Sequence, residues 1–186
     1  MTKKAQRMLA AMDRVDALWN IPNIGRAKGR VIRRLIDRHR PTRGLEIGSL
    51  LGYSAILIAG ALPSGGRLVC IESNDYLAKF VRANVAEAGL ASRVKVVVGD
   101  ALRAVPLLPG RFDLVFIDAR KEDYLDYLRQ LESRLTADAL VIADNTGVFR
   151  KDVAPYLEYV RDPAGPWVSR EYDFGDDCME VSVRRS

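Results

Sequence analysis

Cysteine and histidine are scarce in this chain of 186 residues, which has two cysteines and one histidine. The cysteines, Cys70 and Cys178, lie far apart in expected strands. This spacing excludes the disulfide framework of a small secreted protein. The single histidine, His39, excludes a histidine-rich metal site and argues against a Ser-His-Asp triad. Any chemistry at a site in this protein must therefore be carried by other side chains.

Long apolar runs are absent as well. No stretch approaches about 18 consecutive apolar residues, so we expect no membrane-spanning helix. The first residues are charged and amphipathic, and they have no apolar core of the kind found in signal peptides. With 48% hydrophobic and 28% charged residues, the composition is that of a globular protein. Because no repeat or linker divides the sequence, we expect one soluble, cytoplasmic domain over residues 1–186.

Positive charge is concentrated near the N-terminus. Residues 1–43 contain twelve Lys or Arg and three Asp. A basic segment of this kind can attract an anionic partner such as RNA. Its arginines, however, are interleaved with apolar residues at helical spacing, and the arginine-rich stretch has no aromatic side chains on which bases could stack. The pattern therefore favours a solvated helix face over an RNA-binding surface.

Helices and strands are expected to alternate through most of the chain. Residues 8–19 have the spacing of an amphipathic helix, and a second helix over 27–39 stops before Pro41. The strand cores are continuously apolar, which is typical of a parallel sheet covered on both faces and predicts a doubly wound α/β fold. The tail predicts a hairpin. The expected strands are Gly44–Ile47, Leu68–Ile71, Val94–Val98, Leu114–Ile117 and Leu140–Ala143, with hairpin strands Trp167–Phe174 and Met179–Arg184; the helices between them are Tyr53–Leu62, Asp75–Ala88, Ala101–Leu107, Glu122–Leu135 and Asp152–Val160.

A carboxylate or an amide lies at or just after the end of every strand expected to be parallel. In such a sheet, ligands bind beyond the carboxyl ends of the strands. A single residue of this kind is weak evidence, because Asp and Asn commonly cap helices. Five in corresponding positions are harder to explain by capping alone. They are Glu46 in the first strand and Glu72, Asp100, Asp118 and Asp144-Asn145 after the next four.

The first two strand ends favour a nucleoside ligand without phosphates. Gly48 and Gly52 let the backbone approach a ligand closely. Glu72 follows Gly48 at about the distance in sequence at which an acidic residue binds the ribose hydroxyls of a nucleotide. The remaining glycines of a dinucleotide fingerprint are missing, so NAD and FAD are disfavoured. An acidic pocket suits a positively charged nucleoside, and S-adenosylmethionine meets both conditions. Asp100 would lie near the adenine, and it would also serve as a helix cap.

The last two parallel strands offer oxygen ligands for a metal. Asp118, Asp144 and Asn145 form a set suited to Mg²⁺, with coordination positions left for water and substrate oxygens. Lys121 follows Asp118 where a loop turns into a helix, and beside a dication and a sulfonium it is a candidate general base. A metal would also orient a substrate hydroxyl toward the methyl group. The alternative for Lys121 is a surface ion pair with Glu122 or Asp123.

Four collinear stretches resemble a known family. They are Asn23–Gly29, Leu45–Ala55, Phe112–Lys121 and Ala143–Asn145. Together they resemble the class I, cation-dependent O-methyltransferases, close to the catechol and caffeoyl-CoA O-methyltransferases. The first stretch is most similar to the catechol enzymes, in which this segment closes over the cofactor.

The resemblance implies a Rossmann-like, seven-stranded sheet, mostly parallel with an antiparallel last strand and with helices on both faces. The helices of residues 1–40 would cover the cofactor and substrate side. The implied ligands are S-adenosylmethionine, Mg²⁺ and a hydroxylated small molecule. The implied roles are Glu46, Gly48, Tyr53 and Ser54 around the methionine part of the cofactor, Glu72 on the ribose, Asp100 and Ala101 near the adenine, Asn23 and Ile24 as backbone contacts, Asp118, Asp144 and Asn145 as metal ligands, with Asp118 also facing the cofactor, and Lys121 as the base.

The chain also departs from this family's pattern. Arg120 stands where many caffeoyl-type relatives have Asp. Residues 167–178 offer no clear counterpart of the carboxylate that holds the second catechol hydroxyl. Asp176 and Asp177 are expected to be turn residues rather than ligands, although the topology of the family would bring them close to the site. We therefore expect the chemistry of methyl transfer to carry over better than the identity of the acceptor.

The sequence is compatible with three alternative functions, of which the first is the leading hypothesis. The first is Mg²⁺-dependent methyl transfer from S-adenosylmethionine to a hydroxyl of a small catechol-like acceptor. The second keeps the chemistry but takes a hydroxylated nucleotide in tRNA as acceptor, which the basic N-terminal segment motivates. The third is a non-enzymatic module that binds nucleosides or acts through a dimer surface. By analogy with relatives we expect a homodimer, with the first helix as the candidate contact surface.

Overall fold

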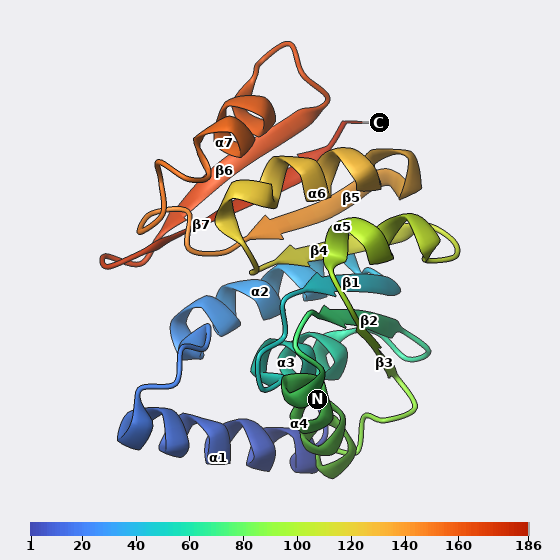
Figure 1. Ribbon diagram of the computed structural model, residues 1–186, viewed down its shortest axis with the longest axis vertical. Helices are drawn as coiled ribbons and strands as arrows, with labels where there is room; N and C mark the ends of the chain where they lie inside the picture. Colours follow the sequence, from blue (N-terminus) through green and yellow to red (C-terminus); the bar gives the residue numbers. More distant parts are fainter. Residues whose placement is uncertain (186) are drawn as a thin grey trace.

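The computed structural model describes residues 1–185 and contains one seven-stranded sheet between two layers of helices (Figure 1). The strand order is β3-β2-β1-β4-β5-β7-β6. The strands are β1 (Arg43–Ile47), β2 (Arg67–Glu72), β3 (Val94–Val98), β4 (Phe112–Ile117), β5 (Leu135–Ala143), β6 (Trp167–Asp173) and β7 (Cys178–Arg184).

The strand directions confirm the expected sheet. Strands β1 to β5 pair in parallel, and β7 is antiparallel to both of its neighbours, β5 and β6. After β3 the chain crosses back to form β4 beside β1, so the strand order reverses between β1 and β4. A crevice opens at such a switch point beyond the carboxyl ends of the strands. The fold therefore brings the loops after β1, β2, β4 and β5 to one edge of the sheet.

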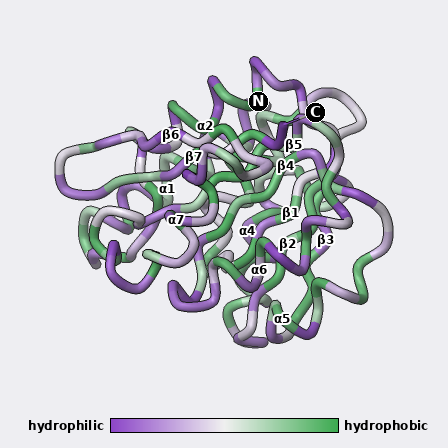
Figure 2. The backbone as a smooth tube through the Cα atoms, turned by 90° about the horizontal axis from the view of Figure 1, so that it is seen from above, coloured by the Kyte–Doolittle hydropathy of each residue, from purple (hydrophilic) through white to green (hydrophobic). Residues whose placement is uncertain are grey.

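Helices cover both faces of the sheet, and each face has its own apolar core. Alternate strand residues point to opposite faces, so Leu114 and Phe116 pack on one core while Val115 and Ile117 pack on the other. Figure 2 shows hydrophobic positions along the central strands and hydrophilic stretches in the outer loops. The first core is covered by α1 (Lys3–Trp19), α2 (Gly25–His39), α3 (Tyr53–Ala61) and α4 (Asp75–Glu87), and the second by α5 (Ala101–Ala104), α6 (Tyr124–Leu131) and α7 (Ala154–Arg161).

Some element boundaries differ from those expected, for local physical reasons. Helix α5 stops at Ala104 and a 3-10 turn follows, because Pro106 has no N–H to continue the helix. Helix α6 is likewise flanked by 3-10 turns rather than running through to Leu135. Strand β5 begins at Leu135, earlier than expected, and pairs with Phe112 across an irregularity in the β4–β5 register. Within residues 1–185, no helix has the length and apolar character needed to cross a membrane.

Candidate active site

Backbone contacts between neighbouring strand ends build the floor of the site. Gly48 has φ +85° and donates its N–H to the carbonyl of Ile71 at 2.9 Å, while the Asp118 N–H donates to Ile47 at 2.9 Å. A Cβ on Gly48 would lie 2.0 Å from the carbonyl oxygen of Asp118. Glycine is therefore required here, because it alone allows the loops after β1 and β4 to approach this closely.

A cavity of about 300 Å³ lies beyond the ends of β1, β2, β3 and β4. The loop before α2 forms one wall of the cavity, and the residues that follow β4 form another. Most of the residues predicted to hold the cofactor line this one space. They are Asn23, Ile24, Gly48, Ser54, Glu72, Asp100, Ala101 and Asp118.

Glu72 is fixed at the centre of this cavity by the backbone around it. Its carboxylate accepts hydrogen bonds from the N–H groups of Ser49 at 3.1 Å, Leu50 at 3.0 Å and Asn74 at 3.0 Å. Asp100 lines the cavity, and as the N-cap of α5 it also accepts a hydrogen bond from the N–H of Arg103. The two carboxylates are thus held in place before any ligand binds.

Glu46 and Tyr53, two other residues predicted to contact the cofactor, are not among those that line the cavity. Glu46 is completely buried, and its carboxylate accepts a hydrogen bond from the Ser49 hydroxyl at 2.7 Å. Burial is the main cause that raises the pKa of Glu46 to about 7. The Tyr53 hydroxyl donates to Asp13 of α1 at 2.9 Å, and its ring lines a separate cavity between α1 and α2.

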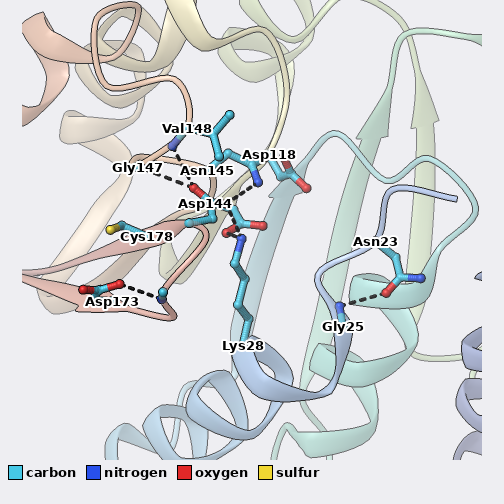
Figure 3. A network of polar contacts seen from close by, with 12 residues as sticks. Asn23, Gly25, Lys28, Asp118, Asp144, Asn145, Gly147, Val148, Asp173 and Cys178 are labelled. Carbon is cyan, nitrogen blue, oxygen red and sulfur yellow. Dashed lines mark hydrogen bonds and ion pairs between the residues drawn. The ribbon is translucent and has the colours of Figure 1, made fainter. Parts of the chain in front are cut away.

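The predicted metal ligands and Lys121 meet at the ends of β4 and β5. The Lys121 ammonium donates to Asp118 Oδ1 and to Asn145 Oδ1, each at 2.8 Å. The surface pairing of Lys121 with Glu122 or Asp123 is therefore not adopted. Figure 3 shows the side chains of Asp118, Asp144 and Asn145 gathered together above the end of the sheet. Because Asp118 also lines the large cavity, the two groups of predicted residues form one continuous site.

Two features hold this cluster in its geometry. Asn145 adopts φ +57°, a left-handed conformation that Asn tolerates better than most residues and that occurs often at functional sites. The buried Tyr124 hydroxyl accepts from the Lys121 ammonium at 2.8 Å and donates to the Asp144 carbonyl at 3.1 Å. Tyr124 was not predicted from the sequence, although it follows Lys121 by three residues, on the same side of a helical turn.

Lys28 and Asp177 join the cluster from distant parts of the chain. The Lys28 ammonium lies 2.6 Å from Asp144 Oδ1 and 2.6 Å from Asp177 Oδ2, and Lys28 is 9% exposed. Asp177 also accepts hydrogen bonds from Asn145 Nδ2 at 2.7 Å and from the N–H groups of Gly147 and Val148. Asp177, expected from the sequence to be a turn residue, thus also contacts the cluster of predicted metal ligands.

The two buried carboxylates have opposite electrostatic environments. Burial, helped by the charge of Asp118, raises the pKa of Asp144 to about 6 despite the opposing effect of Lys28. Burial also acts to raise the pKa of Asp177, but hydrogen bonds from Lys28 and from the Val148 amide outweigh it and lower this pKa to about 2. For Lys28, burial lowers the pKa, and its two carboxylate partners raise it by more.

The family of the chain follows from its match to a family model. The model is described as O-methyltransferase and matches residues 4–158. The chain belongs to this family. The membership confirms the family expected from the sequence motifs, and the matched region contains every predicted metal-ligand and cofactor-binding residue.

Individual relatives of this O-methyltransferase family agree in sequence and in fold. Catechol O-methyltransferase B of Danio rerio is 35% identical over 87% of this chain, which spans 65% of that relative's length. The O-methyltransferase from Bacillus cereus in complex with SAH superposes with a TM-score of 0.84 at 26% identity, covering 96% of this chain and 91% of the other. TomG from Streptomyces achromogenes, in complex with SAM, gives a TM-score of 0.83 at 26% identity over 100% and 91% of the two chains.

Proposed function

We propose that this protein transfers a methyl group from S-adenosylmethionine to a hydroxyl of a small, catechol-like acceptor with the help of Mg²⁺ or a similar divalent cation. One observation carries the proposal: Asp118 belongs both to the wall of the large cavity and to the cluster of oxygen ligands. A donor in the cavity and a hydroxyl at the cluster would therefore be neighbours. The names of the relatives, which include catechol O-methyltransferases, support the same reaction class.

The cavity fits a positively charged nucleoside. Among its lining residues, Glu72, Ser49 and Ser54 are buried and polar. Asp100 and Asp118 add two further carboxylates, and Gly48 keeps the floor free of a side chain. We infer that Glu72 accepts hydrogen bonds from the ribose hydroxyls and that Asp100 and Ala101 face the adenine. Ser54, Gly48 and Asp118 would lie around the methionine part. Glu46 would act from beneath the floor, and we expect Tyr53 to contribute through its position on α3 rather than through its hydroxyl.

The ligand cluster fits a hard divalent cation. Asp144 Oδ1 is buried, has Lys28 as an ion-pair partner, and makes no hydrogen bond of good geometry with the described residues. A buried carboxylate oxygen in this state is suited to a cation, and the oxygens of Asp118 and Asn145 are the other donors. The charges favour binding, because Asp118, Asp144 and Asp177 carry three negative charges against the two positive charges of Lys28 and Lys121.

The residues of the chain supply the remaining chemistry. S-adenosylmethionine, when bound, supplies an electrophilic methyl group, and a divalent cation makes a nearby hydroxyl more acidic. Lys121, once it has released its own proton, would accept the hydroxyl proton, and Tyr124 would keep its nitrogen in position. Bound S-adenosylmethionine would give its methyl group to the acceptor oxygen and become S-adenosylhomocysteine, and Asp118 would lie between the donor and the acceptor.

A methyl-transfer assay tests this function. The protein is incubated with radiolabelled donor and a catechol, with Mg²⁺ or with EDTA, and bulk tRNA serves as a competing acceptor. We expect label in the catechol only when Mg²⁺ is present, and a loss of at least about a hundredfold in Asp144→Ala. Asp37→Ala, which removes an exposed carboxylate on α2, serves as the matched control. Full turnover in EDTA would remove the metal from the proposal, and label in tRNA alone would replace the acceptor.

Assembly is a separate part of the proposal. The end of α1 exposes Leu18 at 79% and Trp19 at 76%, together with a partly exposed Val15. Apolar side chains gathered on one surface helix favour a protein contact, and we propose that this one forms a homodimer. Light scattering after size-exclusion chromatography tests it: we expect a dimer mass for the native protein and a monomer mass for Trp19→Ser. A monomeric native protein would contradict the proposed dimer.

A further inference from the structure

Each oxygen atom that the proposed function assigns to a metal lies close to an ammonium group in the structure. Lys121 bonds the side-chain oxygens of Asp118 and Asn145 at 2.8 Å. Lys28 lies 2.6 Å from Asp144 Oδ1. The two lysines differ in origin, because Lys121 comes from the loop after β4, next to its ligands, whereas Lys28 reaches the site from the first turns of α2 (Figure 3).

The two carboxylates bound by Lys28 depend on it to different degrees. Asp177 has other donors, namely the side chain of Asn145 and the backbone amides of Gly147 and Val148. Asp144 Oδ1 is buried and, among residues 1–185, its ion pair is with Lys28. Lys28 thus neutralises Asp144 where a metal would otherwise do so, and Asp177 gives the same ammonium a second anchor.

We propose that Lys28 is a positioning residue that holds Asp144 in the metal-free protein and competes with the divalent cation for it. This inference rests on the proposed function, because it concerns the same metal ligands. An oxygen that coordinates Mg²⁺ at about 2.0–2.1 Å cannot keep an ammonium at ion-pair distance on the same side without bringing two cations into contact. The same limit applies to Lys121 on Asp118 and Asn145. Lys28 must therefore leave Asp144 when a cation binds, and it has a second carboxylate, Asp177, on which to remain.

The competition lowers the affinity of the site for the metal, and the ion pair of Lys28 stabilises the metal-free protein. A buried Asp144 carboxylate without a positive partner would destabilise the metal-free fold, and Lys28 prevents this. The same segment also borders the cofactor cavity, which Pro22, Asn23 and Ile24 line just before α2.

Calorimetric titration with Mn²⁺ tests the proposal without any need for turnover. Native protein, Lys28→Met and Lys28→Gln are stripped with EDTA, dialysed and titrated with the metal alone. Both variants are expected to bind Mn²⁺ about tenfold more tightly than the native protein, which corresponds to about 1.4 kcal/mol. Lys95→Met removes one exposed positive charge from β3, far from the cluster, and is expected to match the native protein. Unchanged or weaker binding in both Lys28 variants would overturn the proposal.

Thermal unfolding supplies a second readout that also checks folding. In EDTA, both Lys28 variants are expected to melt below the native protein because Asp144 has lost its partner. Added Mn²⁺ is expected to raise their melting temperature by more than it raises that of the native protein, since tighter binding to the folded state stabilises it more. An equal or smaller rise would contradict the competition. If Mn²⁺ binds to neither the native protein nor the variants, the metal in the proposed function fails as well; if it binds to all with equal affinity, only this inference fails.

Discussion

Replacing Glu46 by Gln is expected to change how the stability of the protein depends on pH. The Glu46 side chain is 0% exposed, and burial is the main cause that raises its pKa from 4.5 to about 7. A carboxyl group with a raised pKa favours the folded state while it is protonated. Its stabilising contribution is therefore complete below pH 4.5 and is lost as the pH rises through about 7.

The magnitude follows from the interval between the two pKa values. From 4.5 to about 7, at about 1.4 kcal/mol per pH unit, the loss amounts to about 3 kcal/mol. Glu46→Gln keeps the size and the hydrogen bond to Ser49 but cannot ionise. Between pH 4.5 and pH 8, the free energy of unfolding of the variant should therefore improve by about 3 kcal/mol relative to the native protein.

Urea unfolding followed by tryptophan fluorescence measures this difference, because Trp167 is buried in the fold. The titrations are run without cofactor at several pH values between 4.5 and 8.5, and equal denaturant slopes confirm that the two proteins unfold to the same extent. All other titrating groups are common to both proteins, so they cancel in the comparison. Parallel stability profiles for the two proteins would refute the reasoning.

Three further substitutions test the geometry of the site. Gly48→Ala should lower the free energy of unfolding by about 2–4 kcal/mol in urea titrations, because its Cβ would lie 2.0 Å from the Asp118 carbonyl oxygen at a positive φ; an unchanged stability would contradict the close approach. Lys121→Met should lower kcat by about 10²–10⁴ in the methyl-transfer assay, with the donor KM little changed, and a loss below tenfold would exclude it as the base. Tyr53→Phe removes the bond to Asp13 and should cost about 1 kcal/mol in thermal unfolding without weakening donor binding, whereas a weaker donor affinity would show that the hydroxyl contacts the cofactor.

The sheet and most of the cavity could be predicted from sequence because the evidence is local. Continuous apolar runs such as Leu114–Ile117 are typical of buried parallel strands, and the residues after them must meet at one edge of the sheet. The resemblance then assigned roles to these positions. Whether a side chain lines the cavity or lies outside it was less predictable. Glu46 and Tyr53 belong to the same motif as Gly48, yet the Glu46 side chain lies beneath the cavity floor and that of Tyr53 is directed toward α1.

Lys28, and the contact that Asp177 makes with it, could not be found in this way because they depend on tertiary contacts. Lys28 is one of twelve basic residues before residue 44, and its charge pattern is that of a solvated helix face. Asp177 follows Gly175 and Asp176 in a stretch typical of a turn. Their ion pair joins residues 149 positions apart, and it forms only because the hairpin of β6 and β7 folds back beside β5.

The most direct test of the account is a crystal structure with Mn²⁺ and S-adenosylhomocysteine, measured for anomalous scattering from the metal. We predict one strong anomalous peak within about 2.0–2.4 Å of side-chain oxygens from Asp118, Asp144 and Asn145, with the nucleoside in the adjacent cavity. We also predict the Lys28 ammonium on Asp177 and away from Asp144. A nucleoside bound with no peak at these oxygens, at saturating Mn²⁺, would contradict the metal-assisted mechanism.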